Sequence, residues 1–178
     1  MKIFGQAISQ PVKFQSLGSG SEVTPRTMEL MRKIINDSIR NYYVRRWAEK
    51  IIERAGEDDL SKVQAVYDFL DSHTRYVKDP EGFELLKSPV VSLQLLDAGD
   101  IPSLDCDDLV ILSMSLLKSI GFRVGMRAVS YTPEKIYTHV YGLVYVKPYG
   151  WIPFDLVKHL GLGNEAPLIK YHYIDMEI

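Results

Sequence analysis

Three residues of the kinds that catalyse acyl transfer follow one another along the chain: Cys106, His139 and Asp155. Cys106 is the single cysteine among 178 residues. A cysteine nucleophile needs a base to take its proton and a third group to orient that base, and these groups can be far apart in sequence. Thiol chemistry is therefore one interpretation of this set, provided that the fold brings the three side chains together.

Each of these residues also has a purely structural interpretation. A lone cysteine is usually buried and unreactive. The histidine can be a strand residue with satisfied hydrogen bonds, and Asp155 can cap a turn at the end of a strand. Asp105, Asp107 and Asp108 surround the cysteine, and their charges oppose thiolate formation unless helix capping uses them. The residue types alone leave both interpretations open.

The element that must position the thiol is a helix, which the pattern predicts to begin at or just before Cys106 and to end near Ile120. Asp105 is a natural N-cap, and the two carboxylates after Cys106 fall in the first turn, where free backbone N–H groups and the helix dipole favour negative charge. Gly121 is a suitable C-terminal stop. Apolar residues cover most of the helix surface, so we expect it to be central and buried. A thiol at the start of such a helix is one known route to a thiolate.

After this helix the hydrophobic period changes to that of strands. We expect strands at 122–130, 138–146 and 151–155, joined by short connections and therefore antiparallel. The second strand would carry His139 and the third would end at Asp155. The loop at 131–135 would overhang the site, and a further strand-like segment lies at 168–174.

The first half of the chain reads as an arm followed by helices. Residues 1–23 form the predicted arm, which includes one short strand, and residues 24–178 form a single domain. Within it we expect a helical hairpin at 24–56 with Thr24 as N-cap, a core at 58–157 with helices at about 60–72 and after Ser88, and a tail at 158–178. Residues 26–54 carry eight basic and four acidic side chains, whereas residues 55–108 carry four basic and thirteen acidic ones. We interpret this contrast as attraction within the domain, and stacking of subunits is the alternative.

Composition narrows the class of protein. The hydrophobic content of 46% and charged content of 25% are ordinary for one globular domain. The net charge of −2 gives no signal for nucleic acid or membrane binding. One cysteine excludes an internal disulfide framework and a cysteine-rich zinc site. No apolar run approaches the length of a membrane span, so we expect folding in a cytoplasm.

Several motifs together resemble the transglutaminase-like branch of the papain-like cysteine enzymes, over residues 60 to 157. Within that superfamily the whole chain is most similar to small phage and prophage transglutaminase-like proteins. The shared features are Arg75-Tyr76-Val77-Lys78-Asp79-Pro80, Glu84-Leu85-Leu86, Asp105-Cys106-Asp107-Asp108, His139-Val140-Tyr141 and Trp151-Ile152-Pro153-Phe154-Asp155. One departure is Leu104, which stands where the family usually has glycine.

The resemblance implies an α+β fold in which the helix bearing Cys106 packs on an antiparallel sheet, with an N-terminal helical layer. It also implies that Cys106 attacks a peptide or amide carbonyl, that His139 moves the proton and that Asp155 orients the imidazole. Water as the acceptor would give a protease or amidase, and an amine would give a transglutaminase. No cofactor is implied, and the substrate would be a peptide or protein.

The similarity to phage proteins suggests a second function, that of a virion or assembly component that uses the fold for docking. Its partners would be other phage proteins or its own copies, and it would be located in the host cytoplasm or the virion. For the oxyanion we expect the backbone N–H of Cys106 as the donor, with Gln94 a more distant candidate. We interpret the carboxylates around Cys106 as helix caps and expect no metal site.

Overall fold

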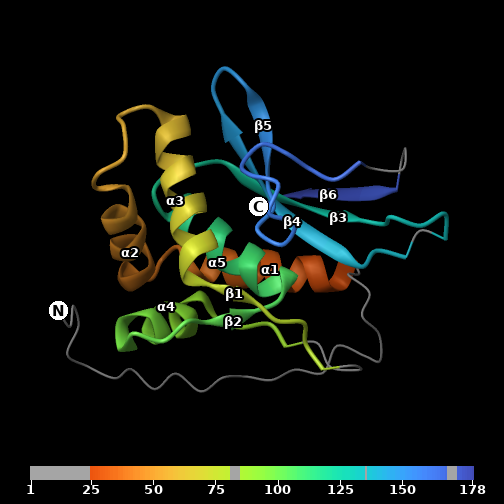
Figure 1. Cartoon of the computed structure of the whole chain (residues 1–178), viewed down its shortest axis with the longest axis horizontal. Coiled ribbons are helices and arrows are strands. Elements are labelled where there is room, and N and C mark those ends of the chain that lie inside the picture. Colours follow the sequence, from red (N-terminus) through yellow and green to blue (C-terminus); the bar gives the residue numbers. More distant parts are fainter. Residues whose placement is uncertain (1–24, 81–84, 135, 168–171) are drawn as a thin grey trace.

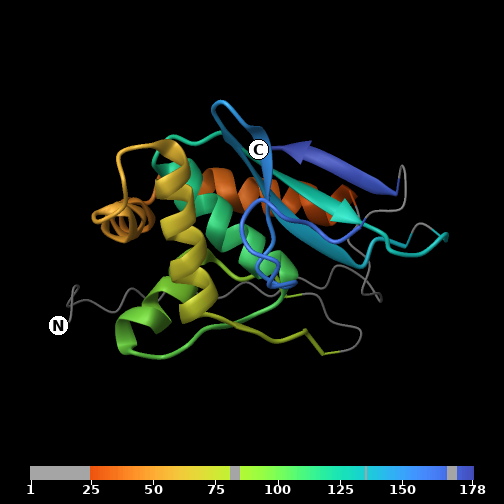
Figure 2. The same cartoon turned by 45° about the horizontal axis from the view of Figure 1, so that its top comes forward.

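The computed structural model describes residues 25–80, 85–134, 136–167 and 172–178. The arm expected at residues 1–23 and the N-cap expected at Thr24 lie outside these ranges. Helices make up one side of the described fold, and a four-stranded antiparallel sheet makes up the other (Figures 1 and 2). This arrangement confirms the α+β class expected from the sequence.

The helices of the described chain lie close to their predicted positions: α1 Pro25–Ser38, α2 Tyr42–Ile52, α3 Asp59–His73, α4 Pro89–Ala98 and α5 Cys106–Ser119. Asn41 and Asp58 explain where α2 and α3 begin, because each side chain accepts a hydrogen bond from a backbone N–H of the first turn. α4 has proline in its first turn and ends at Gly99, whose φ of 85° is the left-handed conformation that glycine adopts at little cost.

The main sheet has the strand order β5-β4-β3-β6, and all neighbouring pairs are antiparallel. Its strands are β3 Val124–Val129, β4 His139–Val146, β5 Gly150–Phe154 and β6 Tyr173–Glu177. The first three agree with the predicted strands. The fourth begins at Tyr173, later than the strand expected at 168–174, of which residues 168–171 lie outside the described ranges.

A second, smaller sheet is absent from the sequence-based prediction. It pairs β1, Arg75–Tyr76, in parallel with β2, Ser103–Leu104. The backbone N–H of Val77 donates to the carbonyl of Leu104 at 2.9 Å. Strands of two residues are too short to give a periodic pattern, so the sequence carries no signal for them. The pairing anchors the segment that leads directly into Cys106.

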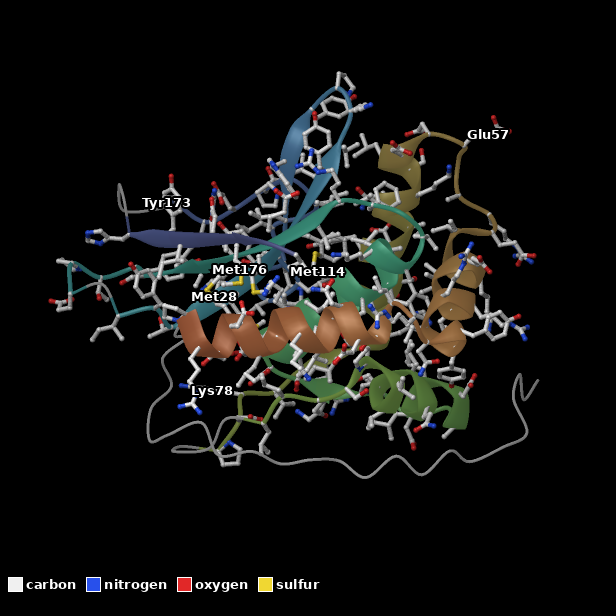
Figure 3. The ribbon with its side chains drawn as sticks, turned by 180° about the vertical axis from the view of Figure 1, so that it is seen from behind. Met28, Glu57, Lys78, Met114, Tyr173 and Met176 are labelled. Atoms are coloured by element: carbon white, nitrogen blue, oxygen red, sulfur yellow. The ribbon has the colours of Figure 1, made fainter. Side chains whose placement is uncertain are left out.

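α5 is the centre of the hydrophobic core. It contacts α1, α2, α3 and α4 as well as β3 and β4, and the helix is buried from Asp107 to Leu117. β4 approaches it closely, because a Cβ on Gly142 would collide with the terminal methyl of Met114. Figure 3 shows Met114 in this layer, together with Met28 of α1 and Met176 of β6, which pack in the same cluster. The predicted buried helix is thus confirmed, and it places Cys106 at the edge of the core.

Candidate active site

Cys106 is the first residue of α5, and its side chain is only partly exposed. The expected N-cap is confirmed, because the Asp105 carboxylate accepts a hydrogen bond of 3.1 Å from the backbone N–H of Asp108. Leu104 is 1% exposed and lies in β2. Strand pairing and a cap therefore shape the turn before the thiol.

His139 and Asp155 form a buried pair, as the strand–turn–strand pattern predicts. His139 is the first residue of β4, and Asp155 directly follows β5. The Nε2 atom of His139 lies 2.8 Å from Oδ2 of Asp155, and the two residues are 5% and 1% exposed. The other carboxylate oxygen accepts the backbone N–H of Val157 at 2.9 Å and that of Lys158 at 3.4 Å. The Tyr67 hydroxyl donates to the Asp155 carbonyl at 3.1 Å, so both the side chain and the backbone of Asp155 are fixed.

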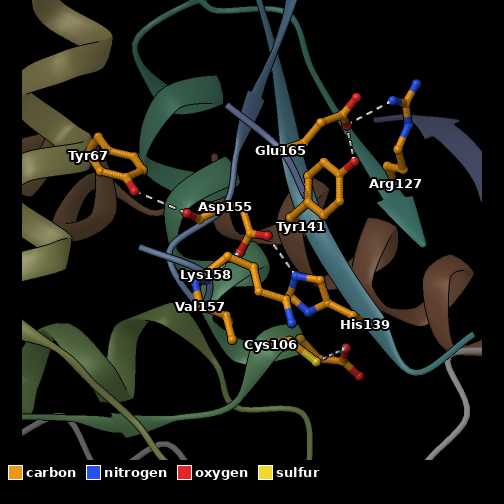
Figure 4. Close-up of polar contacts among 10 residues, drawn as sticks. Tyr67, Cys106, Arg127, His139, Tyr141, Asp155, Val157, Lys158 and Glu165 are labelled. Carbon is orange, nitrogen blue, oxygen red and sulfur yellow. Dashed lines mark hydrogen bonds and ion pairs between the residues drawn. The ribbon is translucent and has the colours of Figure 1, made fainter. Parts of the chain in front are cut away.

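The thiol lies beside the start of β4. A hydrogen bond from the backbone N–H of Val140, the residue after His139, favours its charged form. Cys106 and Asp155 also line one small cavity, together with Val140 and Tyr141. In Figure 4 the imidazole of His139 is drawn between the carboxylate of Asp155 and the sulfur of Cys106. Since Nε2 faces Asp155, Nδ1 is the ring nitrogen that is not paired with this carboxylate.

The surroundings of the thiol keep it protonated at rest. Burial raises the pKa of Cys106 well above its ordinary value, and the charges of Asp107 and Asp105 raise it further. The sulfur also lies 3.5 Å from a carboxylate oxygen of Asp107, to which the S–H can donate. The Val140 N–H opposes this shift but does not overcome it. The helix start therefore does not by itself produce the thiolate that the sequence suggested.

The remaining carboxylates around the thiol hold the local backbone. Asp108 accepts the backbone N–H of Lys87 at 2.7 Å and pairs with the Lys87 ammonium, which also lies 3.9 Å from Asp79. Burial and the charge of Asp108 raise the pKa of Asp105 to about 7. Burial also raises the pKa of Asp108, against the hydrogen bonds and charge of Lys87. These contacts are those of helix caps and a local ion pair.

The described residues hold no group of three His, Cys, Asp or Glu side chains arranged to bind a metal ion. In the same part of the chain, no helix combines the length and apolar character that crossing a membrane requires. The other histidines have partners of their own: the exposed His73 stacks on Phe69, the exposed His159 pairs with Asp71, and the partly buried His172 contacts the Thr132 carbonyl. Gln94 lies on α4, and its suggested part in binding an oxyanion stays a prediction.

Several side chains make contacts at the site that the sequence does not reveal. In the sequence Tyr67 is one position on the apolar face of its helix, yet its hydroxyl donates to Asp155, which is 88 residues further along the chain. Lys87 reads as a surface lysine, yet it neutralises Asp108. Tyr131 and Tyr141 flank His139. In each case the contact depends on tertiary structure, which a single sequence does not show.

Comparison with known proteins agrees with this geometry. The model of the Transglutaminase-like superfamily matches residues 45–156. The fold is similar to a proposed protease from Parabacteroides distasonis ATCC 8503 (TM-score 0.56, 12% identity, 72% of this chain and 26% of that one). It is also similar to a proposed cysteine protease from Cytophaga hutchinsonii (TM-score 0.51, 14% identity, 87% of this chain and 54% of that one). This chain thus spans about a quarter of the length of the first protein and about half of the second. A search of curated protein sequences found no match. On the match of its core, the chain belongs to the transglutaminase-like superfamily.

Proposed function

We propose that the protein carries out thiol-dependent acyl chemistry on a peptide or amide bond, with Cys106 as nucleophile, His139 as base and Asp155 as the group that orients the base. The observation that carries this proposal is the buried hydrogen bond between His139 and Asp155 beside the single thiol at the start of α5. Membership of the superfamily and the fold shared with two proposed proteases support the same class of chemistry.

The contacts define how the proton would move. Asp155 accepts the Nε2–H of His139, so the lone pair of Nδ1 is free to take the thiol proton. Because the resting thiol is protonated, this transfer accompanies attack of the sulfur on the carbonyl carbon. The imidazolium, stabilised by Asp155, then gives the proton to the leaving amine, and a thioester remains on Cys106. His139 next deprotonates the acceptor, which cleaves the thioester, and the proton returns to the sulfur.

The acceptor decides between two outcomes. Water releases a carboxylic acid, which is hydrolysis, and a primary amine forms a new amide, which is transamidation. The negative charge on the carbonyl oxygen needs a donor, and the backbone N–H of Cys106 at the first turn of α5 is suited to it, because the first N–H groups of a helix have no partner within the helix.

Mass spectrometry of peptides incubated with the protein tests this proposal. Candidate peptides are incubated with the protein, with and without a primary amine, and products of hydrolysis or amine incorporation are expected. Cys106→Ala and His139→Ala should abolish both products, whereas His159→Ala, which removes an exposed histidine paired with Asp71, should leave them unchanged.

A thiol that reacts with iodoacetamide only after denaturation, and no product from any peptide, would contradict the proposal. The assembly role would then be the better interpretation, and it predicts self-association of the purified protein or its copurification with a particle.

A further inference from the structure

The segment after residue 156 contributes side chains that hold Tyr141, a neighbour of His139. The family match ends at residue 156, but Glu165 and Asp175 come from beyond it. The Tyr141 hydroxyl donates to the Glu165 carboxylate, which also lies 3.2 Å from the Arg127 guanidinium (Figure 4). The same guanidinium donates two hydrogen bonds to Asp175, at 2.7 and 2.8 Å. A planar guanidinium held by two carboxylates is a well-defined anchor.

Tyr141 is also a neighbour of the imidazole. Its ring centroid lies 5.7 Å from that of His139, at an interplanar angle of 36°. Tyr131 covers the imidazole as well, with centroids 6.3 Å apart and nearly parallel rings. The Tyr131 hydroxyl, however, is buried and has no hydrogen-bond partner among the described residues. Of the two tyrosines, Tyr141 is therefore the one whose position a polar network fixes.

We propose that Tyr141 is a positioning residue for His139, held in place by Glu165 and Arg127, so that the segment after residue 156 is a working part of the active site. This inference rests on the proposed function. The hydrogen bond to Asp155 fixes one ring nitrogen of His139 but still allows the ring to tilt about that bond. Packing against Tyr141 limits the tilt, and it therefore controls where Nδ1 points relative to the thiol.

The protein offers a matched pair of variants for the test. Tyr141→Phe keeps the ring but removes the hydroxyl that donates to Glu165. Tyr145→Phe is the control, since Tyr145 lies on the same face of β4. The centroid of its ring lies 5.6 Å from that of Trp151 and 5.0 Å from Cζ of Arg123. Glu165→Ala tests the same link from the other side and serves as a second variant.

The first readout is the rate of Cys106 alkylation by iodoacetamide as a function of pH. Tyr141→Phe should slow alkylation about 3- to 10-fold at neutral pH, which corresponds to the loss of one hydrogen bond in the network. At high pH hydroxide can remove the thiol proton without help from His139, so the difference should shrink. Glu165→Ala should give the same profile, and the double variant should be no slower than either single one. A loss that is equal at all pH values would indicate a general structural effect and would overturn the proposal.

The second readout does not depend on catalysis. The ¹⁵N and ¹H signals of the His139 imidazole report its tautomer and its titration, and His139→Gln assigns them. Tyr141→Phe should change these signals, and Tyr145→Phe should not. Unchanged signals in Tyr141→Phe would refute the positioning role whether or not the protein is an enzyme. Changed signals with an inert thiol would instead mean that the proposed function is wrong while the contact network is as described.

Discussion

Replacing Asp155 with asparagine separates catalysis from stability more cleanly than any other change at this site. The carboxylate is 1% exposed and accepts three N–H groups, from His139 at 2.8 Å, Val157 at 2.9 Å and Lys158 at 3.4 Å. Asparagine is nearly the same size and keeps an oxygen for the two backbone groups. Its amide nitrogen, however, would replace the oxygen that accepts the imidazole N–H. The ring must then present a bare Nε2 and carry its proton on Nδ1, the nitrogen that should receive the thiol proton.

The expected magnitudes follow from these contacts. The hydrogen bond from the imidazole to a charged acceptor is replaced by a neutral one from the asparagine amide to Nε2, which costs about 1–3 kcal/mol in the free energy of unfolding. Loss of a correctly protonated base costs about 10²- to 10⁴-fold in the rate of acyl transfer. Alkylation of Cys106 at pH 7 should fall by about tenfold or more, because that reaction also needs the thiol proton to be removed. A small effect on folding should therefore accompany a large effect on the thiol.

Iodoacetamide labelling followed by mass spectrometry, with urea unfolding in parallel, measures both quantities. Asp71→Asn is the matched control, because Asp71 pairs with His159 at 3.0 Å but both side chains are exposed. An exposed pair of this kind contributes about 0–1 kcal/mol, and its loss should not change labelling. If Asp155→Asn folds and labels at the wild-type rate at pH 7, Asp155 does not orient the base and the mechanism above is wrong.

Three further predictions concern the surroundings of the thiol and the core. Asp105→Asn keeps a cap but removes a buried carboxyl whose pKa is raised to about 7. Ionising such a group costs the folded state stability as the pH rises from about 4 to 7. In urea unfolding the variant should therefore be about 2–4 kcal/mol more stable than wild type at pH 8 and little changed at pH 4. Lys87→Met leaves the buried Asp108 without its cation and should cost about 3 kcal/mol of unfolding free energy at pH 8. The cost should be smaller at lower pH, because burial raises the pKa of that carboxyl and protonation removes the unpaired charge, and Asp108→Asn in the same chain should restore part of the loss. Gly142→Ala forces a methyl group against Met114 and should cost about 1–3 kcal/mol of unfolding free energy. Because both changes act on this one contact, Gly142→Ala and Met114→Ala together should cost less than the sum of their separate effects.

The parts of the fold that the sequence predicts are those with strong local signals. α5 combines an acidic cap, an apolar surface on nearly all sides and a glycine stop, and each of these is a short-range property. The His139–Asp155 contact follows from two strands joined by a tight turn, because such strands pair in register and bring nearby residues together. The resemblance to a family then assigned roles that spacing alone left open.

The parts that the sequence does not predict depend on long-range contacts or on a balance of opposing effects. β1 and β2 pair across about 28 residues with two residues each, and no periodicity marks them. The protonation of the thiol is a balance between the helix start and the Val140 N–H on one side and burial with two carboxylates on the other. The sequence shows that both influences exist, but their relative size depends on how deeply Cys106 is buried.

The acidic surroundings of the nucleophile have a structural explanation, although they oppose thiolate formation. Asp105 caps the helix through the N–H of Asp108, and Asp108 ties the backbone and ammonium of Lys87 to the helix start. These contacts fix the backbone on both sides of Cys106, whose N–H belongs to the first turn of α5, where N–H groups have no acceptor within the helix. The carboxylates thus order the site at the expense of the thiolate. The proposed mechanism therefore starts from a protonated thiol rather than from an ion pair, and it requires that His139 be held accurately when the carbonyl arrives.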